Sequence, residues 1–434
     1  VTAIGMWAML GAVAAVTSGD ARGRWSWEAG SSTAGTPESH GTENQPAPRC
    51  CAQSWTANGS FWLFGGAGVL PHGSPAGAYL GDLWRFDPGT RVWHPIASAG
   101  SRAANPPGTA TAPAGRNYGM AWVRSRPGHA DQLWMWGGVG VGFPGDVQGS
   151  PLNDTWSFDL GTLRWTQHPM AAPGAEAPSA RNWANYVATE HGAAAWLLSG
   201  VGGPDLYTPL ADMWRFSPDD NTWAKVYSHR GVGPQPNGSD PSPGARMNAY
   251  TAVHGGEIVL YGGEGDGCCD RHGKLTDGDF QDVWRFTPRG GANGTWRFEG
   301  GPRGVGGLPR YGIKGVPDPQ NIPPAEHAGY ILREPFRGAL WFLGGENGQE
   351  QYGMRNDLWS YNLTTREWTW EAGKAGYNGT ATYGSLGVAA AGNTPGARYA
   401  GQAFVALDRL WIFGGYALDS AGSTGYMNDV WSFA

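Results

Sequence analysis

Cysteine, charge and long apolar runs are all scarce in this sequence. Only 4 of its 434 residues are Cys, 15% are charged, and the formal net charge is −6. Scattered Lys and Arg in a mildly acidic chain argue against a general nucleic-acid surface. No apolar run reaches the ~18 residues that a membrane-spanning helix needs. We therefore expect no nucleic-acid partner, and no membrane-spanning segment in residues 24–434.

Catalytic signatures are missing as well. The sequence has no Gly-x-Ser-x-Gly elbow, no Gly-x-x-x-x-Gly-Lys-Ser/Thr phosphate loop and no His-Glu-x-x-His zinc motif. No residue is therefore predicted to be catalytic, and no cofactor is predicted. A binding role is favoured over an enzymatic one.

Glycine, proline and tryptophan are abundant instead, with 72, 32 and 24 residues. Gly and Pro break helices, and at about a quarter of all positions they exclude long amphipathic ones. Aromatic residues make up 12% of the chain, which argues against disorder. The composition therefore indicates an all-β protein with many turns.

One motif, Asp-x-Trp-[Arg/Ser]-[Phe/Tyr], organises the chain. An apolar run ending in small residues precedes each copy, as in FWLFGG at 61–66, and a second Trp follows, as at Trp93. Short strands between Gly- and Pro-rich turns explain this spacing. The motif begins at Asp82, Asp154, Asp212, Asp282, Asp357 and Asp429. We expect each Asp to accept backbone N–H bonds at the turn into its strand.

The Gly-Gly, the Asp-x-Trp strand and the second Trp together resemble kelch-repeat β-propellers. The resemblance covers residues 24–434, and the long repeats are similar to those of secreted attractin-like and galactose-oxidase-like members. It implies an all-β, six-bladed kelch-type β-propeller with four antiparallel strands per blade. Propellers serve many functions, so the resemblance does not by itself indicate one.

The two ends of the chain are expected to meet in one blade. The last repeat stops at Ala434 without its second Trp, whereas RWSWEAG at 24–30 nearly repeats REWTWEAG at 366–373. We therefore predict that the N-terminal strand closes the last blade of a single domain, residues 24–434. Residues 1–23 form an apolar segment that is interpreted either as a signal remnant or as a piece of a precursor.

An aligned position opens each inner strand. In a closed ring, the side chains at this position would surround one mouth of the channel. Five guanidinium groups there could clamp an anionic ligand, or each could bond the acids of neighbouring loops. The candidate ligand-binding residues are Arg49, Arg116, Arg181, Arg246, Glu326 with the adjacent His327, and Arg398.

The long loop 264–282 gathers carboxylates and one imidazole. Such groups could bind Ca²⁺ or a transition metal, although the spacing matches neither an EF-hand nor a known iron motif. A solvated acidic loop is the alternative, and the metal stays unknown. The weak metal candidates are Glu264, Asp266, Asp270 and His272.

The four cysteines form two adjacent pairs, Cys50–Cys51 and Cys268–Cys269. We expect disulfides across the channel between the pairs; two vicinal bridges, or free thiols, are the alternatives. Asn-x-Ser/Thr sequons, like disulfides, indicate an oxidising extracellular compartment. We expect N-linked glycans on the sequon asparagines that lie in surface turns and loops. These are Asn58, Asn237, Asn293, Asn362 and Asn378, whereas Asn153 is expected to be too ordered for modification.

Together these features predict a secreted or cell-surface glycoprotein. The leading hypothesis is an interaction module that binds a protein or glycan partner through its loop-rich channel face. One alternative is an enzyme acting on sugars or small anions, possibly metal-dependent, at the channel mouth. Another is a self-assembling subunit of an extracellular fibre or coat.

Overall fold

The computed structural model describes residues 23–35, 44–69, 77–96, 108–141, 149–169, 175–202, 208–228, 241–266, 277–290, 293–302, 304–332, 336–347 and 353–434. Over these ranges the protein is all-β, with many antiparallel sheets and one 3₁₀ turn, η2 (Glu190–Gly192). The predicted fold class is thus confirmed at the level of all-β. Among the described residues, no helix is both long and apolar enough to cross a membrane.

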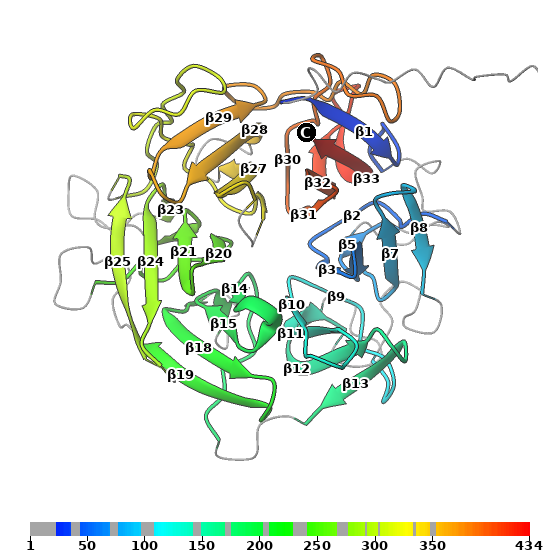
Figure 1. The fold of residues 1–434 in the computed structure, drawn as a ribbon, viewed down its shortest axis with the longest axis vertical. Coiled ribbons are helices and arrows are strands. Elements are labelled where there is room, and N and C mark those ends of the chain that lie inside the picture. Colours follow the sequence, from blue (N-terminus) through cyan, green and yellow to red (C-terminus); the bar gives the residue numbers. More distant parts are fainter. Residues whose placement is uncertain are drawn as a thin grey trace, which may run out of the picture.

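Six sheets of four or five strands dominate the described residues, and Figure 1 shows them arranged about a common centre. The first three sheets contain β3 (Gln53–Ala57), β4 (Ser60–Phe64), β7 (Leu83–Asp87) and β8 (Val92–Pro95); β9 (Arg116–Asn117), β10 (Met120–Arg124), β11 (Gln132–Gly140), β12 (Ser150–Asp159) and β13 (Arg164–His168); and β14 (Asn185–Ala188), β15 (Ala195–Leu198), β18 (Asp212–Ser217) and β19 (Thr222–Ser228).

The other three follow the same chain order. They contain β20 (Tyr250–His254), β21 (Glu257–Tyr261), β24 (Val283–Pro288) and β25 (Gly294–Gly300); β26 (Tyr330–Ile331), β27 (Ala339–Asn347), β28 (Gly353–Asn362) and β29 (Trp368–Ala372); and β30 (Arg398–Tyr399), β31 (Gln402–Ala406), β32 (Arg409–Leu418), β33 (Thr424–Phe433) and β1 (Trp25–Ala29).

Small ladders continue some of these sheets beyond the Gly-Gly pairs. They are formed by β2 (Arg49–Cys50), β5 (Ala67–Gly68) and β6 (Ala78–Tyr79); β16 (Val201–Gly202) and β17 (Thr208–Pro209); and β22 (Glu264–Asp266) and β23 (Asp277–Asp279). Glycine is required at the bend, since Gly66 has φ 101° and a Cβ there would lie 2.5 Å from the Cys50 carbonyl oxygen. The Gly66 amide donates to Arg116 O of the next repeat (2.7 Å), so the bend also joins two sheets.

Each sheet pairs the last aromatic residue of its motif with the second Trp. Phe86 lies opposite Trp93, with ring centroids 5.0 Å apart, and Phe433 lies opposite Trp25 at 5.1 Å. The second Trp also packs on the preceding sheet, as Trp93 does on Phe413 of β32 at 4.9 Å. Aromatic packing therefore fills the space between neighbouring sheets. β1 provides the second Trp of the last sheet, whereas in the other five sheets this Trp comes from the same repeat.

This pairing predicts that Trp25, which is 2% exposed, matters to the fold as much as Trp93, which is 3% exposed. We expect Trp25→Ala and Trp93→Ala each to lower the free energy of unfolding by about 3–5 kcal/mol, because both empty a close-packed aromatic site. Urea denaturation measures the change. Val92→Ala, at a side chain that is 43% exposed, is the control and should change it by less than ~0.5 kcal/mol. A Trp25 variant as stable as wild type would contradict the role of β1.

Candidate functional site

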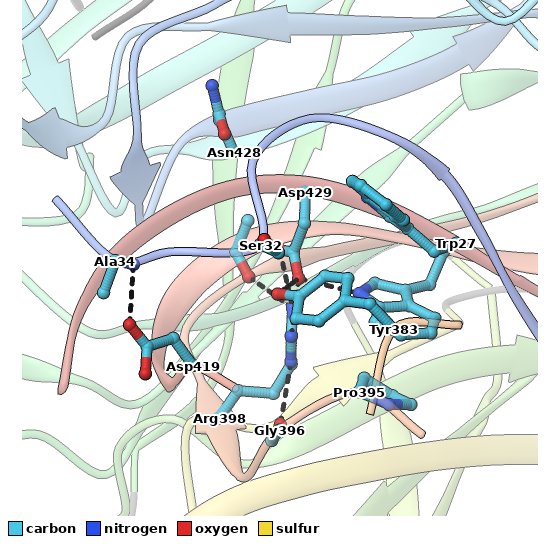
Figure 2. Close-up of polar contacts among 12 residues, drawn as sticks. Trp27, Ser32, Ala34, Tyr383, Pro395, Gly396, Arg398, Asp419, Asn428 and Asp429 are labelled. Atoms are coloured by element: carbon cyan, nitrogen blue, oxygen red, sulfur yellow. Dashed lines mark hydrogen bonds and ion pairs between the residues drawn. The ribbon is translucent and has the colours of Figure 1, made fainter. Parts of the chain in front are cut away.

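The five aligned arginines are buried inside the fold. Arg49 is 1% exposed and Arg398 is 0% exposed, and each forms a two-pronged ion pair with the motif Asp of its own repeat. Arg49 Nη1 and Nη2 lie 2.6 and 2.9 Å from the Asp82 carboxylate oxygens, and Figure 2 shows the equivalent pair, Arg398 and Asp429. The remaining pairs are Arg116–Asp154, Arg181–Asp212 and Arg246–Asp282.

The same guanidinium groups bind the backbone around them. Arg49 Nε donates to Ala47 O (2.9 Å), and Nη1 donates to Gly65 O (2.9 Å) at the Gly-Gly bend. The Asp82 carboxylate in turn accepts from Trp84 Nε1 (2.6 Å). The motif Asp thus accepts mainly from side chains, and the backbone N–H contact that we had expected comes from its own amide.

These contacts give the arginines a structural role. Burial disfavours the ionised carboxyl, but the facing guanidinium outweighs burial and lowers the pKa of Asp82, Asp154 and Asp212 below the usual value. The expected clamp for an anionic ligand at Arg49, Arg116, Arg181, Arg246 and Arg398 is therefore corrected. Their donors are used inside the protein, between an inner strand and the motif strand.

The fifth repeat departs from this arrangement. Glu326 takes the place of the arginine, and Arg355 enters two residues before Asp357. The residues equivalent to Arg355 elsewhere are apolar: Leu80, Leu152, Leu210, Phe280 and Met427. Arg355 Nε lies 3.8 Å from Glu326 Oε2, and the guanidinium stacks 3.8 Å from the centre of the Tyr377 ring. This repeat therefore still has a buried guanidinium, but it lies on the motif strand instead of the inner strand.

Two buried carboxyl groups therefore share one guanidinium. Burial, together with the nearby Asp357 charge, raises the pKa of Glu326 well above its usual value, and burial raises that of Asp357. Asp357 Oδ1, the equivalent of the atom that accepts from Arg Nη1 in the other repeats, has no hydrogen-bond partner among the described residues. The exchange thus leaves this repeat less completely paired than the others.

A repeated loop that the sequence analysis overlooked supports the last two motif aspartates. Tyr-Gly-x-x-Gly-Val begins at Tyr311 and again at Tyr383, each followed ten residues later by Asn. Tyr311 Oη donates to Asp357 (2.6 Å), and Tyr383 Oη donates to Asp429 (2.8 Å), as Figure 2 shows for the second. The identical spacing was the signal that could have found it.

His327 lies beside the Glu326–Arg355 pair, which we call the exchanged pair, and three carboxyl groups surround its imidazole. Its Nδ1 is 2.6 Å from Asp279 Oδ1, and its Nε2 is 3.5 Å from Glu264 and 3.4 Å from Glu346. Burial disfavours the imidazolium, but the bonds to Asp279 and Glu346 outweigh it and raise the pKa of His327 to about 10. The imidazole therefore stays protonated at neutral pH, inside an acidic cluster.

Of the weak metal candidates, Asp270 and His272 lie outside the described residues, and Glu264 belongs to the His327 cluster. No group of three His, Cys, Asp or Glu side chains within the described ranges is arranged to hold a metal ion.

Backbone hydrogen bonds join five of the six pairs of adjacent repeats around the centre of the molecule, whereas between the second and third repeats the Trp183 amide donates to Asn182 Oδ1. Two residues after each aligned Arg or Glu, the chain adopts a left-handed conformation with φ between 51° and 62°. The amide of one such residue donates to the carbonyl of another in the adjacent repeat, as Cys51 does to Ala400 (2.7 Å) and Tyr118 does to Cys51 (2.9 Å). We call the set the girdle: Cys51, Tyr118, Trp183, Asn248, Ala328 and Ala400.

The girdle lines a central cavity of about 560 Å³, which also touches the innermost strand of every sheet. Half-buried aromatic side chains form a partial ring at the girdle, and Tyr118 and Trp183 among them also line the cavity. We call this partial ring the mouth arc: Tyr118, Trp183, Tyr399, Tyr416 and Tyr426. Tyr118 contacts Trp183 (6.1 Å between ring centroids), and Tyr416 contacts Tyr399 (5.6 Å) and Tyr426 (5.5 Å). Burial and the Glu346 charge raise the pKa of Tyr118 and Tyr399, so both keep their hydroxyl protons.

Cys50 and Cys51 are bonded to each other. The expected bridge from this pair across the ring is therefore wrong, because each sulfur forms a single disulfide. Cys268 and Cys269 lie outside the described residues. The vicinal disulfide packs with Ala67 and Ala400, against Tyr118, Tyr399 and Tyr426.

The sequons that the structure describes are exposed. Asn58 lies in the turn between β3 and β4, and Asn362 ends β28. Asn293, Asn378 and also Asn153 are exposed, whereas Asn237 lies outside the described residues. Exposure satisfies the first requirement for glycosylation, and whether glycans are attached stays a prediction.

Comparison with known proteins supports the fold alone. No protein-family model matches the chain. Among solved structures, the chain is similar to the structure of YjhT, with a TM-score of 0.50 and 14% identity, covering 89% of this chain and 95% of that one. At this identity the likeness carries no function.

The exchanged pair can be tested by restoring the arrangement of the other repeats. Arg355→Leu alone should cost about 3–5 kcal/mol of unfolding free energy, because two buried carboxyl groups lose the guanidinium that they share. Adding Glu326→Arg should recover most of this loss, since the new guanidinium can reach Asp357 as Arg398 reaches Asp429. Urea denaturation of both single variants and the double variant gives the coupling. Additive effects would argue against the exchange.

Glu326 should also make stability fall as pH rises. Its folded pKa lies above the unfolded value, so its contribution is complete below pH ~4.5 and is lost as pH rises through the folded pKa. Relative to wild type, Glu326→Gln should therefore gain stability as pH rises above ~4.5. Comparing the two proteins at each pH cancels the opposite contribution of the arginine-paired aspartates. A difference that is independent of pH would contradict the raised pKa.

Proposed function

We propose that this chain is a six-bladed kelch-type β-propeller of the long-repeat, attractin-like or galactose-oxidase-like kind, closed by β1. The six sheets about one centre and the repeated aromatic pairs support this architecture. In this arrangement the cavity is the propeller channel, and the girdle marks its mouth.

We further propose that the protein is an extracellular binding module that recognises a neutral glycan at this mouth. The observation that carries the proposal is the mouth arc, in which Tyr118 and Tyr399 lie within reach of the Glu346 charge, while Glu264 and Glu346 contact the same imidazole, His327. Aromatic faces pack against the C–H face of a sugar, and carboxylates accept hydrogen bonds from its hydroxyls. A cavity of about 560 Å³ falls within the usual range for small-ligand sites.

The charges at the mouth favour a neutral ligand over an anionic one. Glu264, Glu346 and Asp279 surround the imidazolium of His327, and the guanidinium groups of Arg246 and Arg355 form ion pairs with Asp282 and Glu326. An anion would meet net repulsion there. We therefore no longer favour a small anion as the ligand.

Binding is better supported than catalysis. The His327 cluster is where a sugar-active enzyme would place its acid and base, but such groups work best with a pKa near the operating pH. A pKa of about 10 makes His327 a fixed cation that orients Glu264 and Glu346 instead.

An extracellular location is supported by two features. The disulfide Cys50–Cys51 is typical of oxidising compartments, and exposed sequon asparagines are available for glycosylation. Mass spectrometry of the protein secreted from eukaryotic cells tests both.

Glycan binding is tested with neutral trisaccharides (maltotriose, cellotriose and mannotriose) and matched trisaccharides that carry a uronic acid. We expect wild type to bind at least one neutral sugar by calorimetry and to bind its acidic counterpart more weakly. Tyr118→Ala and Glu346→Gln should each reduce affinity about 10-fold or more, since each removes a direct contact. The control is Leu407→Ala, at a 67% exposed side chain on the β31–β32 turn. Stronger binding of the acidic sugars, or no effect of either variant, would overturn the proposal.

A further inference from the structure

A groove of about 450 Å³ lies where the first described residues meet the end of the chain, since the Gly23 amide donates to Ala434 O (2.7 Å). It is lined by residues 23–25, which lead into β1, by residues 371–374, at the end of β29, and by residues 390–394 of the loop that begins at Tyr383. β1 and β29 are the outermost strands of the last two sheets. The groove therefore lies between two neighbouring repeats, beside the strand that completes the last sheet.

A complete sequon, Asn378-Gly379-Thr380, also lines this groove. Asn378 and Thr380 are both exposed. Asn378 Oδ1 accepts from the Met354 amide (3.1 Å), and the Asn378 amide donates to Met354 O (2.8 Å). These bonds hold the residue against β28 and do not use Nδ2, which is the atom that carries an N-linked glycan. A sugar attached here would therefore start at the groove.

The lining of the groove suits a sugar. Gly373, Gly379 and Gly392 allow a ligand to approach the backbone closely. Lys314 supplies donors, since its ammonium group has three N–H bonds and one of them is directed to Gly373 O (2.8 Å). Glu371 is half-buried and adds an acceptor. Sugar hydroxyls both donate and accept hydrogen bonds, so they can pair with all of these groups.

We propose that Asn378 carries an N-linked glycan whose first sugars fill this groove and hold the start of β1 in place. The inference rests on the proposed extracellular location and does not depend on ligand binding at the mouth. The loop at 390–394 already bonds the start of β1, since the Ala390 amide and Asn393 Nδ2 donate to Trp25 O (3.3 and 3.1 Å). A sugar between Asn378 and this loop restricts the same segment, so the glycan stabilises the pairing of β1 with the last sheet.

Attachment follows the usual chemistry of the secretory pathway, in which the oligosaccharide comes from a lipid diphosphate donor. A bond forms between Asn378 Nδ2 and the anomeric carbon of the first sugar. The bond from that carbon to the diphosphate oxygen breaks, and the proton lost by Nδ2 leaves with the released diphosphate. No oxidant or reductant is needed.

The first test compares Asn378 with Asn362, an exposed sequon whose Oδ1 accepts from the amides of Thr364 and Thr365 in a turn (both 2.9 Å). The full chain is secreted from eukaryotic cells, and peptide N-glycosidase is added to the folded protein. Release from Asn378 should be about 10-fold slower than from Asn362, because the sugar must first leave the groove. After denaturation the two rates should be equal. Equal rates on the folded protein would overturn the proposal.

A second measurement separates the sugar from the side chains. Thr380→Ala removes the sequon but keeps Asn378 and its bonds to Met354, whereas Thr380→Ser keeps the sequon. Hydrogen exchange of the amides at 23–29 should be about 10-fold faster in Thr380→Ala and unchanged in Thr380→Ser. Thr364→Ala removes the Asn362 sequon and is the matched control, which should also leave this exchange unchanged. Wild-type exchange in Thr380→Ala contradicts the proposed role of the glycan.

Glycopeptide mass spectrometry distinguishes this inference from the location on which it rests. A secreted chain with a glycan at Asn362 and none at Asn378 overturns the inference alone. A chain that carries no N-linked glycan at any sequon overturns both. Trisaccharide binding at the mouth, measured by calorimetry, should be the same in Thr380→Ala as in wild type, and a loss of that binding would contradict the independence of the two sites.

Discussion

The buried Arg–Asp pair is the interaction on which the rest of the structure depends. In five repeats one guanidinium bonds the motif carboxylate, the Gly-Gly bend and the start of its own inner strand, as Arg49 does with Asp82, Gly65 and Ala47. A charge removed from water is tolerated only when it is fully paired, so these contacts fix the relative positions of three segments far apart in sequence. The indole N–H of each motif Trp donates a further hydrogen bond to the same carboxylate, and the buried indole packs in the sheet that contains the motif strand.

Departures from the repeat gather around the central cavity. In the fifth repeat the buried cation is Arg355 on the motif strand, and Glu326 occupies the place of the usual arginine. His327 contacts three carboxyl groups, and Cys50–Cys51 forms a disulfide where the other repeats have unlinked residues. Proteins accept locally unfavourable arrangements mainly where function requires them. Because the repeats supply their own internal comparison, these departures support the binding site that we propose beside the girdle.

Much of the fold could be predicted from the sequence because its signals are local and repeated. The N-terminal strand at residues 24–30 was placed in the last sheet from the similarity of two short segments, and its pairing with β33 is observed. The arginines were aligned correctly but their role was left open between a ligand clamp and bonds to neighbouring acids, because a repeated spacing does not reveal whether a side chain points to solvent or to a buried carboxylate. The partner of Glu326 could not be found in the same way, since Arg355 lies 29 positions later, on another strand, at a place that is otherwise apolar.

The sequence by itself determined the all-β class and the repeat, because Gly, Pro and Trp act on the residues next to them. Only the tertiary structure decided which charges are buried, that Cys50 bonds its neighbour, and that five aromatic side chains from three repeats form the mouth arc. Those properties depend on distances between segments that meet only when the sheets come together. The chain order of the repeats specifies the scaffold, whereas the chemistry at its centre arises from the packing of one sheet against the next.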